Sequence, residues 1–238
     1  MKIALLGYGK MGKEIESIAQ QRLHTVPLKI SSLNKNEITI ANLQKADVAI
    51  EFSQPENAIG NILKCFEAGI PVVVGTTGWY EHFQMIESEC KKNNATLLYA
   101  TNFSIGVNLF FALNRYLAHL MKNYTEYSVE IEETHHSQKL DSPSGTAITL
   151  AEGIMKVNSN LKKWVNETTD NINEIPITSH RIGNVPGTHR ITYHSTVDSI
   201  EIKHTAHNRS GFALGAVLAA EWLQHKKGIF TINDIINF

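Results

Sequence analysis

The sequence predicts an α/β fold: an N-terminal, doubly wound parallel sheet, followed by an α+β domain with a mixed sheet. Three observations predict it. Short, almost continuously apolar runs alternate with helical stretches over the first hundred residues, which is the rhythm of βαβ units. A glycine-rich loop follows the first of these runs. After about residue 105 the strands instead alternate apolar with polar residues, as in sheets with one solvated face.

The predicted elements of the first part follow one another regularly. Strands are expected at residues 2–6, 25–30, 47–52, 71–74 and 95–99, and helices at residues 11–22, 56–68 and 79–92. In the first helix, Met11, Ile15, Ile18 and Ala19 have helical spacing. Because Val, Ile and Leu run almost without interruption in the strands, both faces of this sheet are expected to be buried.

The second part begins with a long helix and continues with alternating strands. The helix is expected at residues 107–121, with one apolar side made of Leu109, Phe110, Leu113, Leu117 and Leu120. Strands are expected at residues 127–133, 177–182, 188–196 and 199–205, and a helix at 147–155. Residues 158–173 read as an exposed loop or a poorly packed helix, and residues 226–238 as a short tail. A final helix at residues 212–224 is expected to pack back on the first part.

Composition excludes several classes of protein. The 238 residues include 22 Lys and Arg against 23 Asp and Glu, without the basic surplus of a nucleic-acid or anionic-membrane binder. A hydrophobic fraction of 42% excludes a wholly disordered chain. No apolar run approaches the ~18 residues of a membrane span, and the N-terminus lacks the pattern of a signal peptide. We expect a soluble cytoplasmic protein with neither nucleic acid nor membrane as partner.

The glycine-rich loop has the dinucleotide-binding pattern G-x-G-x-x-G. In this setting the first glycine makes the turn, the second lets the backbone approach a pyrophosphate, and the third lets helix and strand pack closely. Alone, the pattern also fits a tight βα turn without a ligand; after the first strand of a βαβ chain it favours a Rossmann-type cofactor site. The candidate residues are Gly7, Tyr8, Gly9, Lys10, Met11 and Gly12.

The end of the second strand bears on which cofactor is used. NAD-binding chains usually place an acidic residue ~20 residues after the loop, but no carboxylate occurs here before Glu37. Lys29, Ser31 and Ser32 could instead hold a 2′-phosphate, although Lys29 could equally be a solvated charge. The pattern therefore favours NADPH, or use of both NADPH and NADH.

Two more loops follow strands of the predicted parallel sheet, where open α/β sheets bind ligands. They supply further candidates for cofactor binding, although turn-forming residues alone would also explain them. The candidates are Gly75, Thr76 and Thr77 in one loop, and Ala100, Thr101, Asn102 and Phe103 in the other.

The densest chemistry lies at residues 133–147, which read ETHHSQKLDSPSGTA between a strand and a helix. Ser144 or the preceding Ser-Pro can cap the helix, and the backbone of Ser144, Gly145 and Thr146 would then form an anion site at its start. His136 and Lys139 would add positive donors. A histidine is suited to proton donation near neutrality, which points to His135. Surface histidines and a simple helix cap are the alternative.

Other clusters are less informative. Residues 181–183 and 187–190 could add positive charge, from Arg181, His189 and Arg190, around an anionic substrate. His204, His207 and Arg209 precede the last helix. The adjacent histidines lack partners with zinc spacing, and Cys65 and Cys90 form no disulfide framework, so neither a metal site nor a reactive thiol is expected.

Taken together, these motifs resemble the dihydrodipicolinate reductase (4-hydroxy-tetrahydrodipicolinate reductase) family nearly from end to end. The most specific segment is similar to the family signature E-x-H-H-x-x-K-x-D-x-P-S-G-T-A. The loops after residues 74 and 99, and the motifs R-x-G and G-x-H at residues 181–189, follow in the expected order. Lys10 stands where the family commonly has Arg, and the second strand lacks the acidic residue that some members use for NADH.

The resemblance implies an activity and a set of roles. The family reduces a cyclic unsaturated imine dicarboxylate with NAD(P)H in the diaminopimelate route to lysine. His135 would be the catalytic acid and Lys139 a second proton donor; which of them delivers the proton stays open. His136, Lys139, Ser144, Gly145 and Thr146 would hold the two substrate carboxylates. Residues 1–105 and 213–238 would bind the dinucleotide, and residues 106–212 would bind substrate and assemble a homotetramer.

Two other functions fit parts of the pattern. A semialdehyde or sugar dehydrogenase would share both domains, but the first needs a catalytic cysteine, and neither cysteine here lies near a strand-end cluster. A regulatory protein that senses the cofactor would keep the fold without needing His135 and Lys139 as proton donors.

Overall fold

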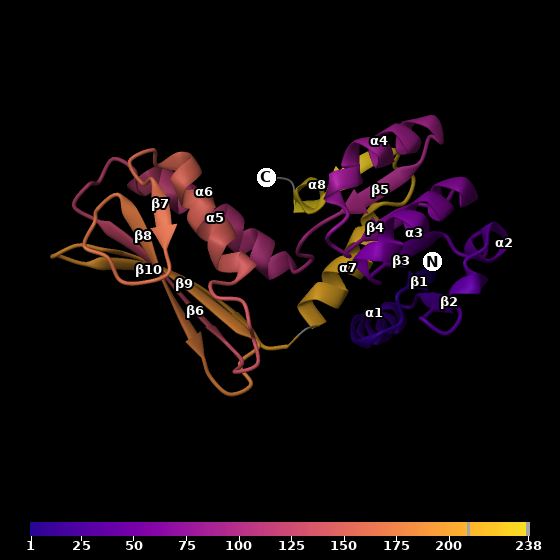
Figure 1. Cartoon of the computed structure of the whole chain (residues 1–238), viewed down its shortest axis with the longest axis horizontal. Coiled ribbons are helices and arrows are strands. Elements are labelled where there is room, and N and C mark those ends of the chain that lie inside the picture. The colour runs from indigo at the N-terminus through magenta and orange to yellow at the C-terminus, as the bar shows by residue number, and fades with distance from the viewer. Residues whose placement is uncertain (209, 237–238) are drawn as a thin grey trace. The chain divides into compact units, whose positions relative to one another are not determined.

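The computed structural model describes residues 1–208 and 210–236. The chain divides into two compact units, Met1–Ile105 with Ser210–Phe238, and Gly106–Arg209. Each unit has its own sheet (Figure 1). Each also has its own apolar core.

The first unit is built on a six-stranded sheet in the order β11-β5-β4-β3-β1-β2, and every neighbouring pair is parallel. Its strands are β1 (Lys2–Leu6), β2 (Thr25–Ile30), β3 (Val48–Glu51), β4 (Val72–Val74), β5 (Thr96–Tyr99) and β11 (Gly228–Thr231). Its helices are α1 (Lys10–Gln21), α2 (Ile40–Leu43), α3 (Pro55–Ala68), α4 (Phe83–Lys92), α7 (Ser210–Trp222) and α8 (Ile232–Ile236), with short 3-10 turns at Lys35–Glu37 and Tyr80–His82. The predicted doubly wound parallel sheet is confirmed.

Both faces of this sheet are buried, as the apolar strands predict. Alternate residues of β1 divide between two cores: Ala4 and Leu6 pack with α3 and α4, whereas Ile3 and Leu5 pack with α1 and α7. Strand β1 lies between β2 and β3, so the chain reverses its direction of winding there. Open α/β sheets bind ligands at this reversal, beyond the carboxyl ends of the strands.

The prediction that residues 226–238 form a short tail is wrong for residues 228–236. Residues 228–231 form β11, which pairs in parallel with β5, and α8 follows at once. A four-residue strand at a sheet edge depends on its neighbour for hydrogen bonds, so its own sequence predicts it weakly. Residues 237 and 238 lie outside the described chain.

The second unit has a five-stranded mixed sheet in the order β10-β9-β6-β8-β7. Its strands are β6 (Ser128–His135), β7 (Lys163–Val165), β8 (Glu174–Arg181), β9 (Gly187–His194) and β10 (Ser199–Ala206), and its helices are α5 (Ile105–Met121) and α6 (Gly145–Val157). Strand β6 runs parallel to β8 and antiparallel to β9. Side chains of α5 and α6 share one core with the sheet, including Phe110, Leu150 and Ile131. The predicted mixed sheet is confirmed.

Two details of this unit differ from the prediction. Strand β7 lies within the segment expected to be a loop, because Lys163–Val165 pairs with β8. Helix α5 buries Phe110 and Leu117, but Leu109, Leu113 and Leu120 are 43%, 48% and 49% exposed, so the predicted apolar side is only half right. In residues 1–208 and 210–236, no helix has the length and apolar character needed to cross a bilayer.

Candidate active site

A cavity of about 340 Å³ opens at the carboxyl ends of β1, β2 and β3 in the first unit. The glycine loop lines one side through Gly7, Tyr8 and Gly9, and residues 52–54 after β3 line the other. This volume lies in the range of small-molecule sites. The cavity therefore fits one part of a dinucleotide laid over the glycine loop.

The glycine loop is held so that only glycine fits at two positions. Gly7 has a φ of +110°, and a side chain there would place its Cβ 2.1 Å from the carbonyl oxygen of Phe52. Gly12 lies in the first turns of α1, and its Cβ would lie 2.3 Å from the carbonyl oxygen of Gly7. The loop backbone is anchored in turn by two hydrogen bonds, from the Gly7 and Tyr8 amides to Ile30 at 3.0 and 2.7 Å. This is the close helix–strand packing that the pattern predicts.

The other predicted cofactor residues lie at the same edge of the sheet. Lys10, Met11 and Gly12 begin α1, Gly75, Thr76 and Thr77 follow β4, and Ala100, Thr101, Asn102 and Phe103 follow β5. Thr76 is buried, and its hydroxyl accepts a hydrogen bond from the Ser53 amide at 2.8 Å. The Phe103 ring lies 5.6 Å from that of Phe52, next to the cavity wall.

Two lysine side chains near the second strand have different surroundings. Lys29 donates to Glu16 at 2.7 Å, and this hydrogen bond raises the pKa of Lys29. Lys29 therefore stays charged and is paired with Glu16. It does not belong to the cavity lining. Lys35 lines the cavity beside Ser31 and Ser32, with its ammonium 3.1 Å from the Asn57 side chain. Of the two lysines, Lys35 lines the cavity and Lys29 does not.

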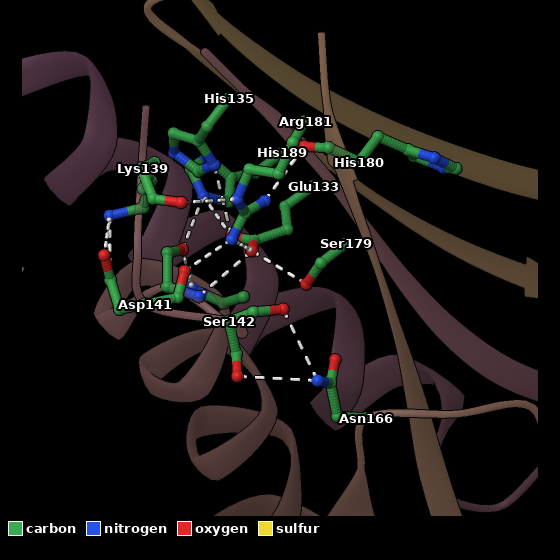
Figure 2. A network of polar contacts seen from close by, with 12 residues as sticks. Glu133, His135, Lys139, Asp141, Ser142, Asn166, Ser179, His180, Arg181 and His189 are labelled. Atoms are coloured by element: carbon green, nitrogen blue, oxygen red, sulfur yellow. Dashed lines mark hydrogen bonds and ion pairs between the residues drawn. The ribbon is translucent and has the colours of Figure 1, made fainter. Parts of the chain in front are cut away.

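Strand pairing builds the cluster in the second unit around Glu133. On the central strand β6, Glu133 lies opposite Ser179 of β8 on one side and His189 of β9 on the other. Two residues further along β6, His135 lies opposite Arg181. The buried side chains therefore converge from three strands (Figure 2).

The two oxygens of the Glu133 carboxylate have separate neighbours. Oε1 accepts hydrogen bonds from the Ser144 amide at 3.0 Å, from Ser179 at 2.8 Å and from Arg181 at 3.1 Å. Oε2 faces His135 Nδ1 at 3.4 Å and His189 Nε2 at 3.6 Å. Burial raises the pKa of Glu133, but the nearby His189 ring and the hydrogen bonds from Ser144 and Ser179 outweigh it and hold the pKa below its usual range. Glu133 is therefore an anion at neutral pH.

His135 is only 8% exposed, which determines its charge. Burial is the main cause that lowers its pKa to about 4. The Glu133 carboxylate opposes this shift, whereas His189, Lys139 and Arg181 add to it. Without an added anion, the imidazole is therefore neutral at pH 7.

The residues of the predicted anion site lie at the start of α6, although the Ser144 amide already donates to Glu133. Ser144 is the cap: its hydroxyl accepts a hydrogen bond from the Ala147 amide at 3.2 Å. Gly145 and Thr146 occupy the first turn. His136 is half-buried next to His135. Lys139 donates to both carboxylate oxygens of Asp141 at 2.8 Å, so its charge is paired by an exposed side chain (Figure 2).

Some predicted positive charges lie elsewhere. Arg190 forms ion pairs with Glu132 and Glu201. Glu132 alternates with the buried Ile131 and Glu133 on β6, so this pairing lies on the other face of the sheet. His204 packs against Phe110, with ring centroids 5.9 Å apart. Arg209 lies outside the described residues.

Glu133, His135 and His189 offer three ligand atoms within 4.8 Å of one another, which is an arrangement that could hold a metal ion. Arg181, however, places its guanidinium on the same carboxylate at 3.1 Å. A divalent cation would be repelled by the positive charge of this guanidinium. The proton of a neutral imidazole next to the carboxylate adds no net positive charge to the cluster. The arrangement favours proton chemistry.

The cysteines bear on the alternative dehydrogenase function. Cys65 and Cys90 are both buried in the first unit. Burial raises the pKa of both thiols. A semialdehyde dehydrogenase needs a reactive thiolate, and neither cysteine supplies one.

Comparison with known proteins decides the family. The family described as "Dihydrodipicolinate reductase, N-terminus" matches residues 1–103, and the one described as "Dihydrodipicolinate reductase, C-terminus" matches residues 106–236. The chain belongs to the dihydrodipicolinate reductase family. The resemblance drawn from the motifs is confirmed, and the chain is an oxidoreductase of the diaminopimelate and lysine pathway.

Relatives within the family match over almost the whole chain. A 4-hydroxy-tetrahydrodipicolinate reductase of Christiangramia forsetii is 53% identical over 237 residues, covering 100% of this chain and 98% of the relative. That of Rickettsia rickettsii is 37% identical over 236 residues, covering 95% of each chain. A solved structure, dipicolinate-bound dihydrodipicolinate reductase from Paenisporosarcina sp. TG-14, has a TM-score of 0.79 at 24% identity and covers 99% of both chains. The last comparison supports the fold.

Sequence reasoning gave no role to Glu133, although a signal for it was available. Val129 and Ile131 point to the core of the second unit, and a period of two places Glu133 and His135 on the same side. A carboxylate on the apolar side of a strand is rarely buried without a partner. Its partners Ser179 and His189 come from other strands, so only the strand register reveals them.

Proposed function

We propose that this chain reduces the dihydrodipicolinate ring, formed by loss of water from 4-hydroxy-tetrahydrodipicolinate, to tetrahydrodipicolinate. The first unit would hold the nicotinamide cofactor over residues 7–12 and at the loops after β4 and β5. When bound, the cofactor supplies the hydride. His135 and Lys139 would supply the proton, and the second unit would hold the substrate.

One observation supports these roles most strongly: a single carboxylate joins the proton source to the anion site. Glu133 binds the Ser144 amide through one oxygen and faces the His135 ring with the other. A substrate carboxylate at the start of α6 would therefore lie close to the donor. The helix N-terminus, with Ser144, Gly145 and Thr146, favours an anion there. His136 and Lys139 would bind the second carboxylate, which would replace Asp141 on Lys139.

Binding of the dianionic substrate at this site would also favour protonation of His135. The pKa of His135 is lowered to about 4 in the free chain, mainly by burial. A nearby negative charge favours the protonated form of histidine. Substrate binding would therefore protonate His135, and this proton would be the one transferred in the reaction.

A direct assay tests this proposal. A synthase makes the substrate in situ from pyruvate and aspartate semialdehyde, and loss of NADPH or NADH absorbance measures turnover. We expect oxidation of the cofactor that depends on the synthase. Folded protein that binds cofactor but oxidises neither NADPH nor NADH would contradict the proposal and favour a sensor.

Substitutions test the residue roles. His135→Gln and Lys139→Met should each lower kcat by about 10²–10⁴-fold, because a positioned proton donor contributes that much. Cofactor affinity should stay unchanged. His180→Gln is a matched control, since His180 is exposed on β8 and points away from the cluster (Figure 2).

For the cofactor we propose a preference for NADPH, with its 2′-phosphate bound by Ser31, Ser32 and Lys35. These residues line the cavity beside the glycine loop. Lys35→Met should weaken NADPH binding by about tenfold, since one partly exposed charge contact contributes about 1–2 kcal/mol, and leave NADH binding unchanged. Lys45→Met, an exposed lysine at the end of α2 that lies outside the cavity lining, is the control. A larger loss of NADPH binding in Lys29→Met would return the role to Lys29.

Assembly and location complete the proposal. By family resemblance, the chain would form a homotetramer through the sheets of the second unit and act in the cytoplasm. Sedimentation of the purified chain tests the assembly, and a monomer at assay concentration would contradict it.

A further inference from the structure

The cluster of the second unit contains two buried polar atoms that face each other without a standard hydrogen bond. Within the described part of the chain, Glu133 Oε2 and His135 Nδ1 each have no hydrogen bond of normal geometry. They lie 3.4 Å apart. Leaving a buried polar atom without a hydrogen bond costs free energy, so the close approach of these two atoms calls for an explanation.

The position of the carboxylate specifies which nitrogen of His135 carries a proton in the neutral ring. An anionic oxygen next to Nδ1 favours the Nδ1–H tautomer, which leaves Nε2 as the nitrogen that gains and loses the reactive proton. Space is available at that nitrogen, because β9 begins with a glycine. A Cβ at Gly187 would lie 3.2 Å from His135 Nε2 and 3.3 Å from Cδ2.

We propose that Glu133 is a positioning residue for the reduction: it fixes the tautomer of His135 and stabilises its imidazolium form. This inference rests on the proposed role of His135 as proton donor. In the step, the Nε2–H bond of the imidazolium breaks and the proton passes to the ring that has accepted the hydride. The Nδ1 proton stays on His135, next to the Glu133 carboxylate, and the imidazole becomes neutral.

Charges from every element around His135 enter this balance. Arg181 of β8, His189 of β9 and Lys139 of the loop after β6 all disfavour a second positive charge. Glu133 is the anion among these neighbours, and it is 1% exposed, so water screens its effect little. Its loss would leave Lys139, Arg181 and His189, which all lower the pKa of His135, so the ring would lose its proton at lower pH.

Glu133→Gln tests the proposal because it keeps the shape and removes the charge. The amide oxygen can still accept from Ser144, which leaves the amide NH₂ to donate to Nδ1 and favours the wrong tautomer. We expect kcat to fall by about 100-fold or more. The alkaline limb of kcat against pH should move about one pH unit lower, since an opposite charge at this distance shifts a titration by at least that much. Glu133→Asp should restore part of kcat and of the pH profile.

Glu132→Gln is the matched control. Glu132 also pairs with an arginine, Arg190, but on the opposite face of the same strand and away from the histidines. We expect kcat and the pH profile of this variant to match those of the unsubstituted chain.

Nitrogen NMR of histidine-labelled protein gives a readout that does not depend on activity. In the unsubstituted chain at pH 7 we expect His135 to carry its proton on Nδ1, with the resonance assigned by its absence in His135→Gln. In Glu133→Gln we expect the proton on Nε2.

The possible results distinguish a failure of the proposed role of Glu133 from a failure of the proposed role of His135 as proton donor. Full turnover in His135→Gln would contradict the proposed donor, whatever the tautomer. Loss of turnover in His135→Gln together with an Nε2–H tautomer in the unsubstituted chain would overturn the role of Glu133 alone. So would a Glu133→Gln variant with an unmoved pH profile. Zinc bound in a 1:1 ratio and required for turnover would replace the inference with a metal site.

Discussion

Substituting Gly12 by alanine tests the glycine loop as a cofactor site. The new Cβ would lie 2.3 Å from the Gly7 carbonyl oxygen, whereas ordinary contact begins at 3.4 Å, so α1 and the loop must separate by about 1 Å. The loop resists this movement, because the amides of Gly7 and Tyr8 are bonded to Ile30 at 3.0 and 2.7 Å. The helix therefore has to move away from the position at which its first amides would meet a pyrophosphate.

The size of the effect follows from two separate costs. Overpacking of this kind costs about 1–3 kcal/mol of stability, and each kcal/mol lowers Tm by about 2–4 °C in a chain of this length. Loss of one hydrogen bond to a charged phosphate costs a further amount of about 1.5–3 kcal/mol of affinity, which corresponds to about 10- to 100-fold in the Kd for NADPH. Both quantities are measured on the same protein, by thermal unfolding and by calorimetric titration.

Gly60→Ala is the control for this experiment. Gly60 is exposed on α3, and nothing lies within 4 Å of a Cβ placed there. This variant should gain about 0.5–1 kcal/mol of stability and bind NADPH unchanged, because alanine is the better helix former. If Gly12→Ala bound NADPH as tightly as Gly60→Ala, the glycine loop would not be the pyrophosphate site.

Three other predictions concern the first unit. Cys65 and Cys90 should not react with a thiol reagent at pH 8 until the chain is unfolded, because burial raises the pKa of both thiols; fast labelling of the folded chain would contradict this. Burial raises the pKa of Glu51, so this carboxyl favours folding below its unfolded pKa and loses that contribution as pH rises through its folded value. Glu51→Gln should therefore raise Tm more at pH 8 than at pH 4.5, and an equal change at both would refute the reasoning. Trp79→Phe removes a buried hydrogen bond of 2.8 Å to the Thr76 carbonyl and should cost about 1–3 kcal/mol in chemical denaturation; a change below 0.5 kcal/mol would show that the carbonyl finds another partner.

Local patterns were sufficient for most of the fold. In β1 and β4 the apolar runs coincide with the strands, and helical spacing located α1 within one residue at each end. These features depend on residues close together in the chain, so the sequence shows them directly. The errors have a different origin: β7 and β11 have three and four residues and depend on hydrogen bonds to a neighbouring strand.

The features of the candidate site likewise divide into those that the sequence shows and those that only the tertiary structure shows. The sequence by itself determined the glycine loop, the capping Ser144 and the presence of His135 and Lys139 in one short segment, because each is a property of consecutive residues. Only the tertiary structure decided that Lys29 forms an ion pair with Glu16 and that Lys35 lines the cavity. It also decided which side chains surround His135.

Glu133 shows the physical reason most clearly. Its partners Ser179 and His189 are 46 and 56 residues away along the chain, and they become neighbours through the pairing of β6 with β8 and β9. A shift of one residue in either register would turn those side chains to the opposite face of the sheet. The sequence thus determines which groups are available for proton transfer and anion binding, and the register of three strands determines which of them meet.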